Sequence, residues 1–405
     1  MPYFCLYRHT GIMPKLPAPD ADALAQSCKL VSLIKHEIAA AGGWIPFRRY
    51  MELALYAPGL GYYSGGAQKF GRGGDFITAP ELTPLFGQAL AAQVAEVMRM
   101  SHPTVIEAGA GSGVLAADLL RELDRLDCLP ESYGILELSA QSRVRQQQTL
   151  AALDPRLASR VVWLDVPPET FSGVLVGNEV LDAIPMHVIA VRGGEVFERG
   201  VACPVPGAFA WEERPARGRV LEAAQELPLP VGIAVEGGIG FVTEVNLAAA
   251  AWVADWGARL RCGALLLFDY GYPCGEFYLP IRSRGTLMCH YRHHAHEDPF
   301  LWPGLNDITG SVDFTAMAEA GFDAGLDVLG HTNQGQFLLN CGLLERLAGC
   351  GPSDSAAYTR ASVAAQKLTL PHEMGELFKV LALGRGVATD VPLMGFVRGD
   401  RTHML

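Results

Sequence analysis

The residues best suited to chemistry are a run of glycines with an acid just ahead of it, Val105-Ile106-Glu107-Ala108-Gly109-Ala110-Gly111-Ser112-Gly113. Glycine is needed where a chain turns sharply from a strand into a helix, and where a ligand must touch bare backbone. Three glycines at alternate positions exceed what one tight turn requires. We therefore expect a cofactor at Gly109, Gly111 and Gly113; a tight connection without a ligand is the alternative.

The spacing and the charge of this turn distinguish two cofactors. Dinucleotide-binding folds use G-x-G-x-x-G, but here the third glycine comes one position early and Val114 occupies the expected place. Glu107 precedes Gly109 by two residues, and a carboxylate there would oppose a pyrophosphate. The same carboxylate suits a ligand that carries a cationic amino group and a sulfonium. The charge therefore predicts S-adenosylmethionine, and Glu107 is expected to bind it.

Three further acids are candidates for binding this cofactor. Glu137 ends the next predicted strand and can accept hydrogen bonds from both ribose hydroxyls. Asp165 ends the strand after that and can accept from the adenine amino group, or can simply cap a helix. Asp75 lies in GGDFITAPEL, a segment expected to fold over the cofactor as a lid. In that lid Asp75 or Glu81 can complete the acceptor pocket; alternatively, Thr78 or Asp75 starts the helix at Pro80.

A second acidic segment, Asn178-Glu179-Val180-Leu181-Asp182, follows the fourth strand, where such folds address the methyl acceptor. Asn178 offers a donor and an acceptor, while Glu179 and Asp182 can face a cation. An arginine acceptor is protonated in water, so its methylation needs carboxylates that grip the guanidinium and receive charge as a proton leaves. Asn178, Glu179 and Asp182 are thus the predicted catalytic residues. The alternative is that Asn178 caps a helix with Glu179 in its first turn.

The elements that must position these side chains alternate between short apolar strands and helices. Strands are predicted at 104–109, 133–138, 160–165, 173–179 and 264–271, with helices at 114–123, 140–150 and 246–261, and two further strands at 322–330 and 377–384. Such alternation is typical of a parallel α/β sheet covered on both faces. Ligands bind such sheets at the carboxyl edge. One rim should therefore carry Glu107, Glu137, Asp165, Asn178, Glu179 and Asp269.

The flanking segments divide the chain into two expected parts. Residues 1–99 form a helical and glycine-rich extension with the lid, including a helix from Asp20 or Asp22 to about Ala41 and another from Pro80 through Met100. Residues 100–405 form the catalytic domain. A β-rich lobe is inserted at about 186–240, with a hairpin turning at Gly193 and Gly194.

Composition narrows the possible partners and locations. A net charge of −11 makes nucleic acid a poor partner. The nine cysteines are odd in number and include no C-x-x-C pair, so we expect reduced, mostly buried thiols. No apolar run approaches the ~20 residues that span a bilayer and the start is unlike a secretory signal, so a cytoplasmic protein without membrane insertion is expected. The histidines at 290–296 fit no metal-binding spacing, which favours a polar loop over the active site and no metal.

Taken together, these motifs resemble the MidA-like methyltransferases over nearly the whole chain. The shared segments are Gly61-Tyr62-Tyr63, Gly74-Asp75-Phe76-Ile77-Thr78-Ala79-Pro80-Glu81, the glycine turn, Asn178-Glu179-Val180-Leu181-Asp182-Ala183-Ile184-Pro185, Asp269-Tyr270-Gly271, Gly285-Thr286-Leu287 and Asp307-Ile308-Thr309. The resemblance implies a Rossmann-like class I methyltransferase fold with a mostly parallel seven-stranded sheet. It also implies, for mitochondrial members, methylation of an arginine in a complex I subunit. Ser311 stands where the family often has histidine.

The preferred hypothesis is therefore an S-adenosylmethionine-dependent protein arginine methyltransferase. Its partner would be an arginine-containing protein segment, its location the cytoplasm or, in a eukaryote, the mitochondrial matrix, and a homodimer is possible. Three alternatives stay open at this point. They are an assembly factor that binds the cofactor with weak turnover, a small-molecule methyltransferase, and an NAD-linked oxidoreductase.

Overall fold

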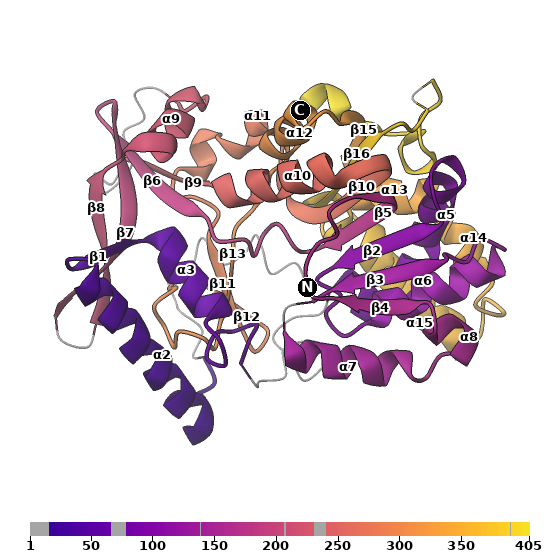
Figure 1. Ribbon diagram of the computed structural model, residues 1–405, viewed down its shortest axis with the longest axis horizontal. Helices are drawn as coiled ribbons and strands as arrows, with labels where there is room; N and C mark the ends of the chain where they lie inside the picture. Colours follow the sequence, from indigo (N-terminus) through magenta and orange to yellow (C-terminus); the bar gives the residue numbers. More distant parts are fainter. Residues whose placement is uncertain (1–15, 66–77, 138, 206–207, 231–239, 389) are drawn as a thin grey trace.

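The main sheet of the molecule is mostly parallel and lies at one end of it (Figure 1). The computed structural model describes residues 16–65, 78–137, 139–205, 208–230, 240–388 and 390–405. The strand order is β15-β16-β10-β5-β2-β3-β4, with β14 beside β10. The bounds are β2 Thr104–Ala108, β3 Ser132–Leu136, β4 Val161–Leu164, β5 Phe171–Asn178, β10 Leu260–Tyr272, β14 Val312–Asp313, β15 Asp327–Asn333 and β16 Phe378–Arg385. Only β16 runs antiparallel to its neighbours β10 and β15. The predicted class I fold is confirmed.

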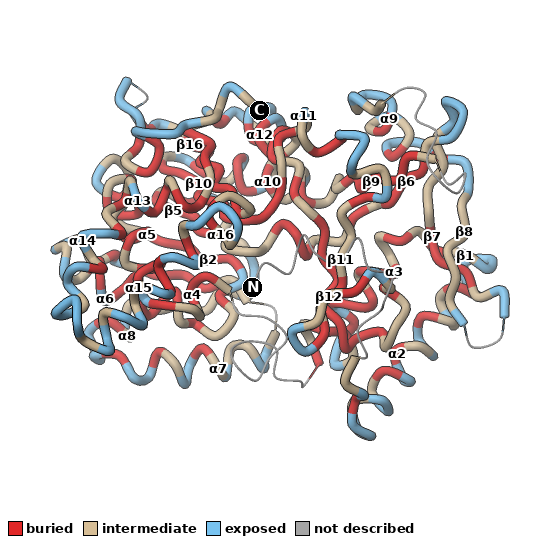
Figure 2. Tube along the Cα trace, turned by 180° about the vertical axis from the view of Figure 1, so that it is seen from behind, coloured by how far each residue is buried: buried red, intermediate tan, exposed pale blue. Residues whose placement is uncertain are grey.

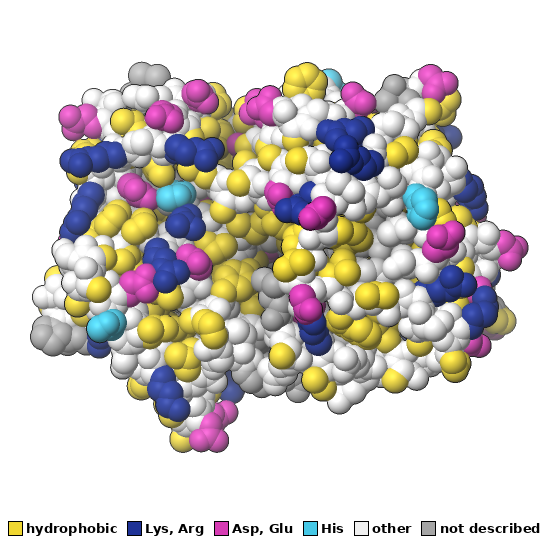
Figure 3. Space-filling model, viewed as in Figure 1, with side chains coloured by type: hydrophobic (Ala, Val, Ile, Leu, Met, Phe, Trp, Pro, Cys, Tyr) yellow, Lys and Arg dark blue, Asp and Glu magenta, His cyan; other side chains and the backbone are white. Residues whose placement is uncertain are grey.

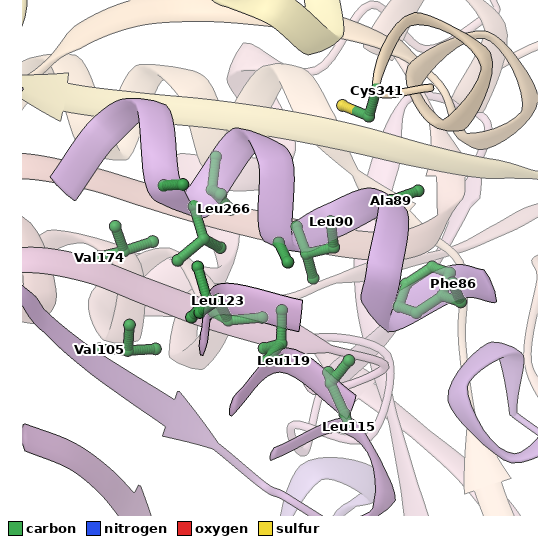
Figure 4. Packing of buried hydrophobic residues seen from close by; sticks show 14 of the residues in the cluster. Phe86, Ala89, Leu90, Val105, Leu115, Leu119, Leu123, Val174, Leu266 and Cys341 are labelled. Atoms are coloured by element: carbon green, nitrogen blue, oxygen red, sulfur yellow. The ribbon is translucent and has the colours of Figure 1, made fainter. Parts of the chain in front are cut away.

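Helices cover both faces of this sheet because successive strand residues point to opposite sides. Val105 and Val174 face the core under α5 and α6, whereas Ile106 and Leu175 face the core under α10 and α12. Figure 4 shows leucines of α6 packed toward β2, β5 and β10, and Figure 2 shows the strands as the most buried part. The helices around the sheet are α5 Pro84–Met100, α6 Val114–Arg125, α7 Ala140–Leu150, α8 Pro155–Ala158, α10 Leu247–Arg259, α12 Phe314–Asp323, α13 Gln334–Asn340, α14 Leu343–Ala348, α15 Ala356–Thr369 and α16 Met374–Leu377.

A second, antiparallel sheet forms a lobe at the other end of the molecule (Figure 1). Its order is β1-β7-β6-β9 with β8 beside β7, and the bounds are β1 Trp44–Pro46, β6 His187–Arg192, β7 Glu195–Val205, β8 Ala208–Pro215 and β9 Phe241–Val245. The hairpin predicted at Gly193 and Gly194 is confirmed, since Arg192 pairs with Glu195. Ile45 pairs with Val201, so the N-terminal segment and the insertion share one sheet. Helices α2 Ala21–Ala40, α3 Phe47–Tyr56 and α9 Gly218–Glu226 accompany this sheet.

A small third sheet carries the histidine-rich segment. It has the order β12-β11-β13, with β11 Met288–Tyr291, β12 His294–His296 and β13 Asp307–Thr309. The prediction of a loop was therefore wrong for most of 290–296, because the chain forms a hairpin whose turn places Arg292 and His293 at positive φ. The short helix α11 spans Cys274–Phe277 nearby, and single 3₁₀ turns lie at Pro280–Arg282, Met394–Phe396 and Thr402–Met404.

Two predicted boundaries differ from the structure for local reasons. The helix expected from Pro80 through Met100 is broken into α4 (Ala79–Leu82) and α5 by Thr83, whose φ of −167° is extended. Pro84 disfavours helical geometry in the residue before it, which explains the break. The strand expected at 322–330 begins only at Asp327, because α12 continues to Asp323 and Gly325 then turns the chain with a φ of 81°.

The cysteines are less buried than predicted. Within the described residues all eight are free, and only Cys289 and Cys341 are buried, while Cys28 is exposed. No helix in the described part of the chain combines the length and the apolar character needed to cross a membrane.

Candidate functional site

The glycine turn joins β2 to α6 at the carboxyl edge of the main sheet. Gly109, Gly111 and Gly113 have φ of 68°, 52° and 81°, respectively. This left-handed region costs other L residues roughly 1–2 kcal/mol each. A Cβ on Gly113 would also lie 3.2 Å from the Cα of Gln146. The three predicted glycines thus form one turn that presents bare backbone at the edge where α/β folds bind ligands.

Glu107 is a buried carboxylate at the end of β2, just before this turn. Its Oε2 accepts a hydrogen bond of 2.6 Å from the Tyr133 hydroxyl. Burial, with a smaller contribution from the negative charge of Glu137, raises the pKa of Glu107 to about 7, although the hydrogen bond from Tyr133 lowers it. No Lys, Arg or His of the described residues forms an ion pair with Glu107. The site therefore offers a buried negative charge that a cationic ligand would complement.

Glu137 follows β3 and is held in contact with the glycine turn. Its Oε1 accepts from the Ser139 backbone N–H at 2.8 Å, and its Oε2 accepts from Gln146 Nε2 at 2.9 Å. The same Gln146 nitrogen donates to the Gly111 carbonyl at 3.2 Å. Gln146, which the sequence did not single out, thus links the two predicted binding elements.

Asp165 lies farther out than the other predicted acids. Its side chain is 85% exposed and pairs with Arg143 at 2.7 Å. Arg143 in turn donates to the carbonyls of Glu137 and Leu164, both at 2.8 Å. The pairing keeps Asp165 near the ends of β3 and β4, but the contact with adenine stays a prediction.

Asn178 and Glu179 lie side by side where β5 ends. Asn178 Nδ2 donates to Glu179 Oε1 at 3.1 Å, and the Glu179 backbone N–H donates to the Phe268 carbonyl at 2.8 Å. Glu179 has a φ of 52°, a strained conformation for a residue other than glycine. No helix begins here, so the reading of Asn178 as a helix cap was wrong. The chain forms a turn here and not a helix because the Glu179 backbone is bonded to Phe268 on the neighbouring strand.

Asp182 lies three residues after Glu179 in the same turn, and its backbone is held by Asp269 of the neighbouring strand. Asp269, wholly buried at the end of β10, accepts backbone N–H bonds from Leu181 at 2.9 Å and Asp182 at 3.2 Å through one oxygen. Its other oxygen accepts from the Tyr270 backbone at 2.9 Å. Asp269 therefore positions the turn. The sequence placed it on the rim without a role.

Charge accumulates in this turn. Burial, and then the charge of Asp182, raises the pKa of Glu179 to about 8. Burial raises the pKa of Asp182 to about 6, although the Tyr270 hydroxyl and two backbone N–H groups favour its ionised form. Burial and the charges of Asp182 and Glu179 raise the pKa of Asp269 well above its usual range. Glu179 and Asp182 can therefore take up or release protons near neutral pH.

The described end of the predicted lid reaches both halves of the site. The Ala79 backbone N–H donates to the Glu179 carboxylate. The Ser112 hydroxyl, in the glycine turn, donates to Glu81. The Thr78 side chain makes no capping bond to α4, so the start of this helix by a Thr78 cap was wrong, while the same role for Asp75 stays a prediction. Asp75, the remaining predicted cofactor ligand, lies outside the described residues.

The described residues show neither a metal site nor, on the face drawn in Figure 3, a basic surface. Of the residues that the structure describes, no group of three or more His, Cys, Asp or Glu is arranged to hold a metal ion. Burial lowers the pKa of His290 to about 4, so its ring is neutral at pH 7. Basic and acidic side chains are interspersed over the face seen in Figure 3.

Comparison with known proteins identifies the family. A family model for S-adenosyl-L-methionine-dependent methyltransferases matches residues 88–332, which is well over half of the chain. The chain belongs to this family. The methyltransferase also matches a crystal structure from Burkholderia thailandensis that holds S-adenosylhomocysteine. The two share 51% identity at a TM-score of 0.91, over 96% of this chain and 100% of that one.

Curated animal relatives align with most of the length of this methyltransferase. The mitochondrial protein arginine methyltransferase NDUFAF7 homologue of Drosophila melanogaster is 29% identical, over 95% of this chain and 92% of its own length. The Danio rerio protein arginine methyltransferase NDUFAF7 is 26% identical, over 87% of this chain and 86% of its own. The predicted resemblance to MidA-like methyltransferases is confirmed.

S-adenosylmethionine is therefore the cofactor of this methyltransferase, as the charge of Glu107 predicted, and the NAD-linked alternative is excluded. The residues of the site fit this ligand. Glu107 supplies a buried negative charge, and Glu137 stands beside the bare backbone of the glycine turn. Which of the predicted residues contact the cofactor stays a prediction.

Proposed function

We propose that this methyltransferase transfers a methyl group to an arginine side chain of a partner protein. The names of its animal relatives support this acceptor. The observation that carries the proposal is the pair of carboxyl groups on one turn, Glu179 and Asp182. Asp182 is buried, and neither forms an ion pair with a cation of the described residues. A guanidinium supplies the missing positive charge and matches carboxylates in planar, forked geometry.

The proposed roles follow from the contacts of each side chain. Glu107 and Glu137, with Asp165 and Asp75, hold the methyl donor beside the glycine turn. Asn178 orients the acceptor, because its Oδ1 is buried without a hydrogen-bond partner in the described structure and can accept from a guanidinium N–H.

The transfer is a single in-line displacement. The bound cofactor supplies a methyl group on a sulfonium, which is already a good leaving group. The acceptor nitrogen forms a bond to the methyl carbon while the carbon–sulfur bond breaks, and that electron pair stays on sulfur. The proton of the nitrogen passes to Glu179. Placement of the reactants carries most of the rate gain, since well-oriented groups can save ~7–11 kcal/mol of the barrier.

Labelled S-adenosylmethionine tests the proposal directly. The purified protein should label a discrete protein band in a lysate of its own cells, and hydrolysis of that band should release methylarginine. Glu179→Gln should abolish the label, whereas the exposed control Glu319→Gln should leave it unchanged. Label found only in small molecules would instead identify a metabolite methyltransferase and contradict the proposal.

We also predict the location and the oligomeric state of this methyltransferase. The animal relatives are named as mitochondrial. For this chain we expect the cytoplasm, or the mitochondrial matrix in a eukaryote. A homodimer should scatter light with twice the mass of the 43.5 kDa chain, and a mass of one chain would contradict it.

A further inference from the structure

Two tyrosines form a stacked pair beside the acidic turn. Tyr56, the last residue of α3, and Tyr63 have ring centroids 5.4 Å apart and an interplanar angle of 20°. Tyr56 is 37% exposed as a residue, whereas Tyr62 belongs to the core at 2%. Tyr56 is thus the accessible member of the pair, and Tyr63 stacks against it. The proposed roles of the catalytic residues make no use of this pair.

The pair is held in place by backbone contacts. The Tyr62 backbone N–H donates to the Ala54 carbonyl at 2.9 Å, and that of Tyr63 donates to Leu55 at 2.8 Å. A Cβ on Gly61 would lie 2.7 Å from the Leu55 carbonyl oxygen, so only glycine permits this close return of the chain. This accounts for the Gly61-Tyr62-Tyr63 motif.

Each hydroxyl of the pair is bonded to a different part of the molecule. The Tyr56 hydroxyl donates to the Ala183 carbonyl at 3.0 Å, next to Asp182 in the acidic turn. The Tyr63 hydroxyl donates to Asp307 Oδ1 at 2.9 Å, at the start of β13. Helix α3 and β13 lie between the lobe and the main sheet (Figure 1). Three motifs far apart in sequence therefore meet at one place.

Negative charge surrounds the accessible ring. Burial of its hydroxyl raises the pKa of Tyr56, and the carboxylates of Asp307, Asp182 and Glu137 raise it further. The buried Oδ1 of Asp182 has no hydrogen-bond partner in the part of the chain that is described. An aromatic face among carboxylates attracts a planar cation through both its ring quadrupole and the neighbouring charges.

We infer that Tyr56, backed by Tyr63 and flanked by Asp182 and Asp307, is the binding platform for the guanidinium of the acceptor. This inference rests on the proposed arginine methylation and names the residues that recognise its substrate. The guanidinium stacks on the ring of Tyr56, whose hydroxyl is bonded to Ala183 in the turn that follows Glu179. Lysine, whose ammonium is compact and strongly hydrated, stacks less well on the same ring.

A binding measurement tests the platform without requiring turnover. The probe is end-blocked Gly-Arg-Gly, with its citrulline counterpart as the neutral isostere, titrated into the S-adenosylhomocysteine complex. Tyr56→Leu should weaken binding of the arginine peptide about five- to thirty-fold, the range expected for a partly desolvated cation–π contact. Tyr56→Phe keeps the ring and should stay within about twofold of wild type. The control Phe322→Leu replaces an exposed ring at the end of α12 and should change nothing.

Other outcomes separate this inference from the proposed function. Equal weakening by Tyr56→Phe and Tyr56→Leu would show that the hydroxyl only holds the turn, and no weakening by Tyr56→Leu would remove the platform; either result overturns the inference. If Tyr56→Leu forms methylarginine at the wild-type rate, the proposed function is supported and the platform is overturned. If the arginine peptide binds in a Tyr56-dependent way but no methylarginine forms, the platform stands and the proposed function fails.

Discussion

The Asp269 carboxylate accepts a hydrogen bond of 2.9 Å from the backbone N–H of Leu181. This bond joins β10 to the turn after β5, across two neighbouring strands of the main sheet. It keeps the turn that carries Glu179 and Asp182 in one conformation.

Asp269→Ala should destabilise the fold and slow methyl transfer. It removes the acceptor for three buried backbone N–H groups, and each unsatisfied group costs about 1–3 kcal/mol. We expect the free energy of unfolding in urea to fall by at least ~2 kcal/mol, and kcat to fall more than the affinity for S-adenosylhomocysteine. The control Asp327→Ala, at an exposed position, should leave both unchanged. Unaltered kcat in Asp269→Ala would refute the positioning role.

Glu107→Gln should raise the stability of the fold above neutral pH and lower the affinity for the cofactor. Burial raises the pKa of Glu107 from about 4.5 to about 7, so between these pH values the folded protein holds this proton while the unfolded chain releases it. Wild type therefore loses stability as pH rises from about 4.5 to about 7, by on the order of 3 kcal/mol. Glu107→Gln does not lose stability in this pH range. In denaturant unfolding, its free energy of unfolding should therefore gain nothing over wild type at pH 4 and should show the full gain at pH 8.

The same variant should bind the cofactor less tightly. Glutamine offers no negative charge to an amino group, so the Kd for S-adenosylhomocysteine in calorimetry should rise at least about tenfold. The exposed Glu131→Gln is the matched control and should alter neither Kd nor stability. Wild-type affinity in Glu107→Gln would show that this carboxylate does not serve the cofactor.

The rate of methyl transfer should rise with pH through about 8. Glu179 must be ionised to accept a proton, and its pKa is raised to about 8, so the reactive form predominates only above that pH. The profile of kcat/KM reports this group in the free enzyme. Asp182→Asn removes a neighbouring negative charge and should move the inflection to lower pH. Glu179→Gln should lose about 10²–10⁴-fold in rate and the inflection with it; an inflection that persists there belongs to another group.

Gly113→Ala should impair cofactor binding beyond its effect on the fold. Its φ of 81° strains an L residue by about 1–2 kcal/mol, and the new Cβ would press on Gln146, which holds Glu137. Gly194→Ala is a matched control, since its φ is 87° but no atom lies within 4 Å of its Cβ. Both variants should lower the melting temperature, and only Gly113→Ala should weaken S-adenosylhomocysteine binding. Equal binding by both variants would contradict the assigned role of the turn.

The sequence by itself determined the alternating strands and helices, the glycine turn and the nature of the cofactor. These features depend on local patterns. Apolar runs of strand length predict buried parallel strands, and Gly109, Gly111 and Gly113 have φ values that glycine alone adopts easily. The charge of Glu107 then distinguished a cationic ligand from a pyrophosphate without any knowledge of the fold.

Only the tertiary structure decided how the acidic segment is held and what surrounds it. The sequence left a helix cap at Asn178 open as an alternative, but bonds from Glu179 to Phe268 and from Leu181 to Asp269 made a turn instead. No local pattern indicated that Tyr56 would reach this turn, since a contact between segments distant in the chain leaves no periodic signal. The contact between Tyr56 and this turn depends on how the lobe packs against the main sheet, and that packing depends on the whole chain.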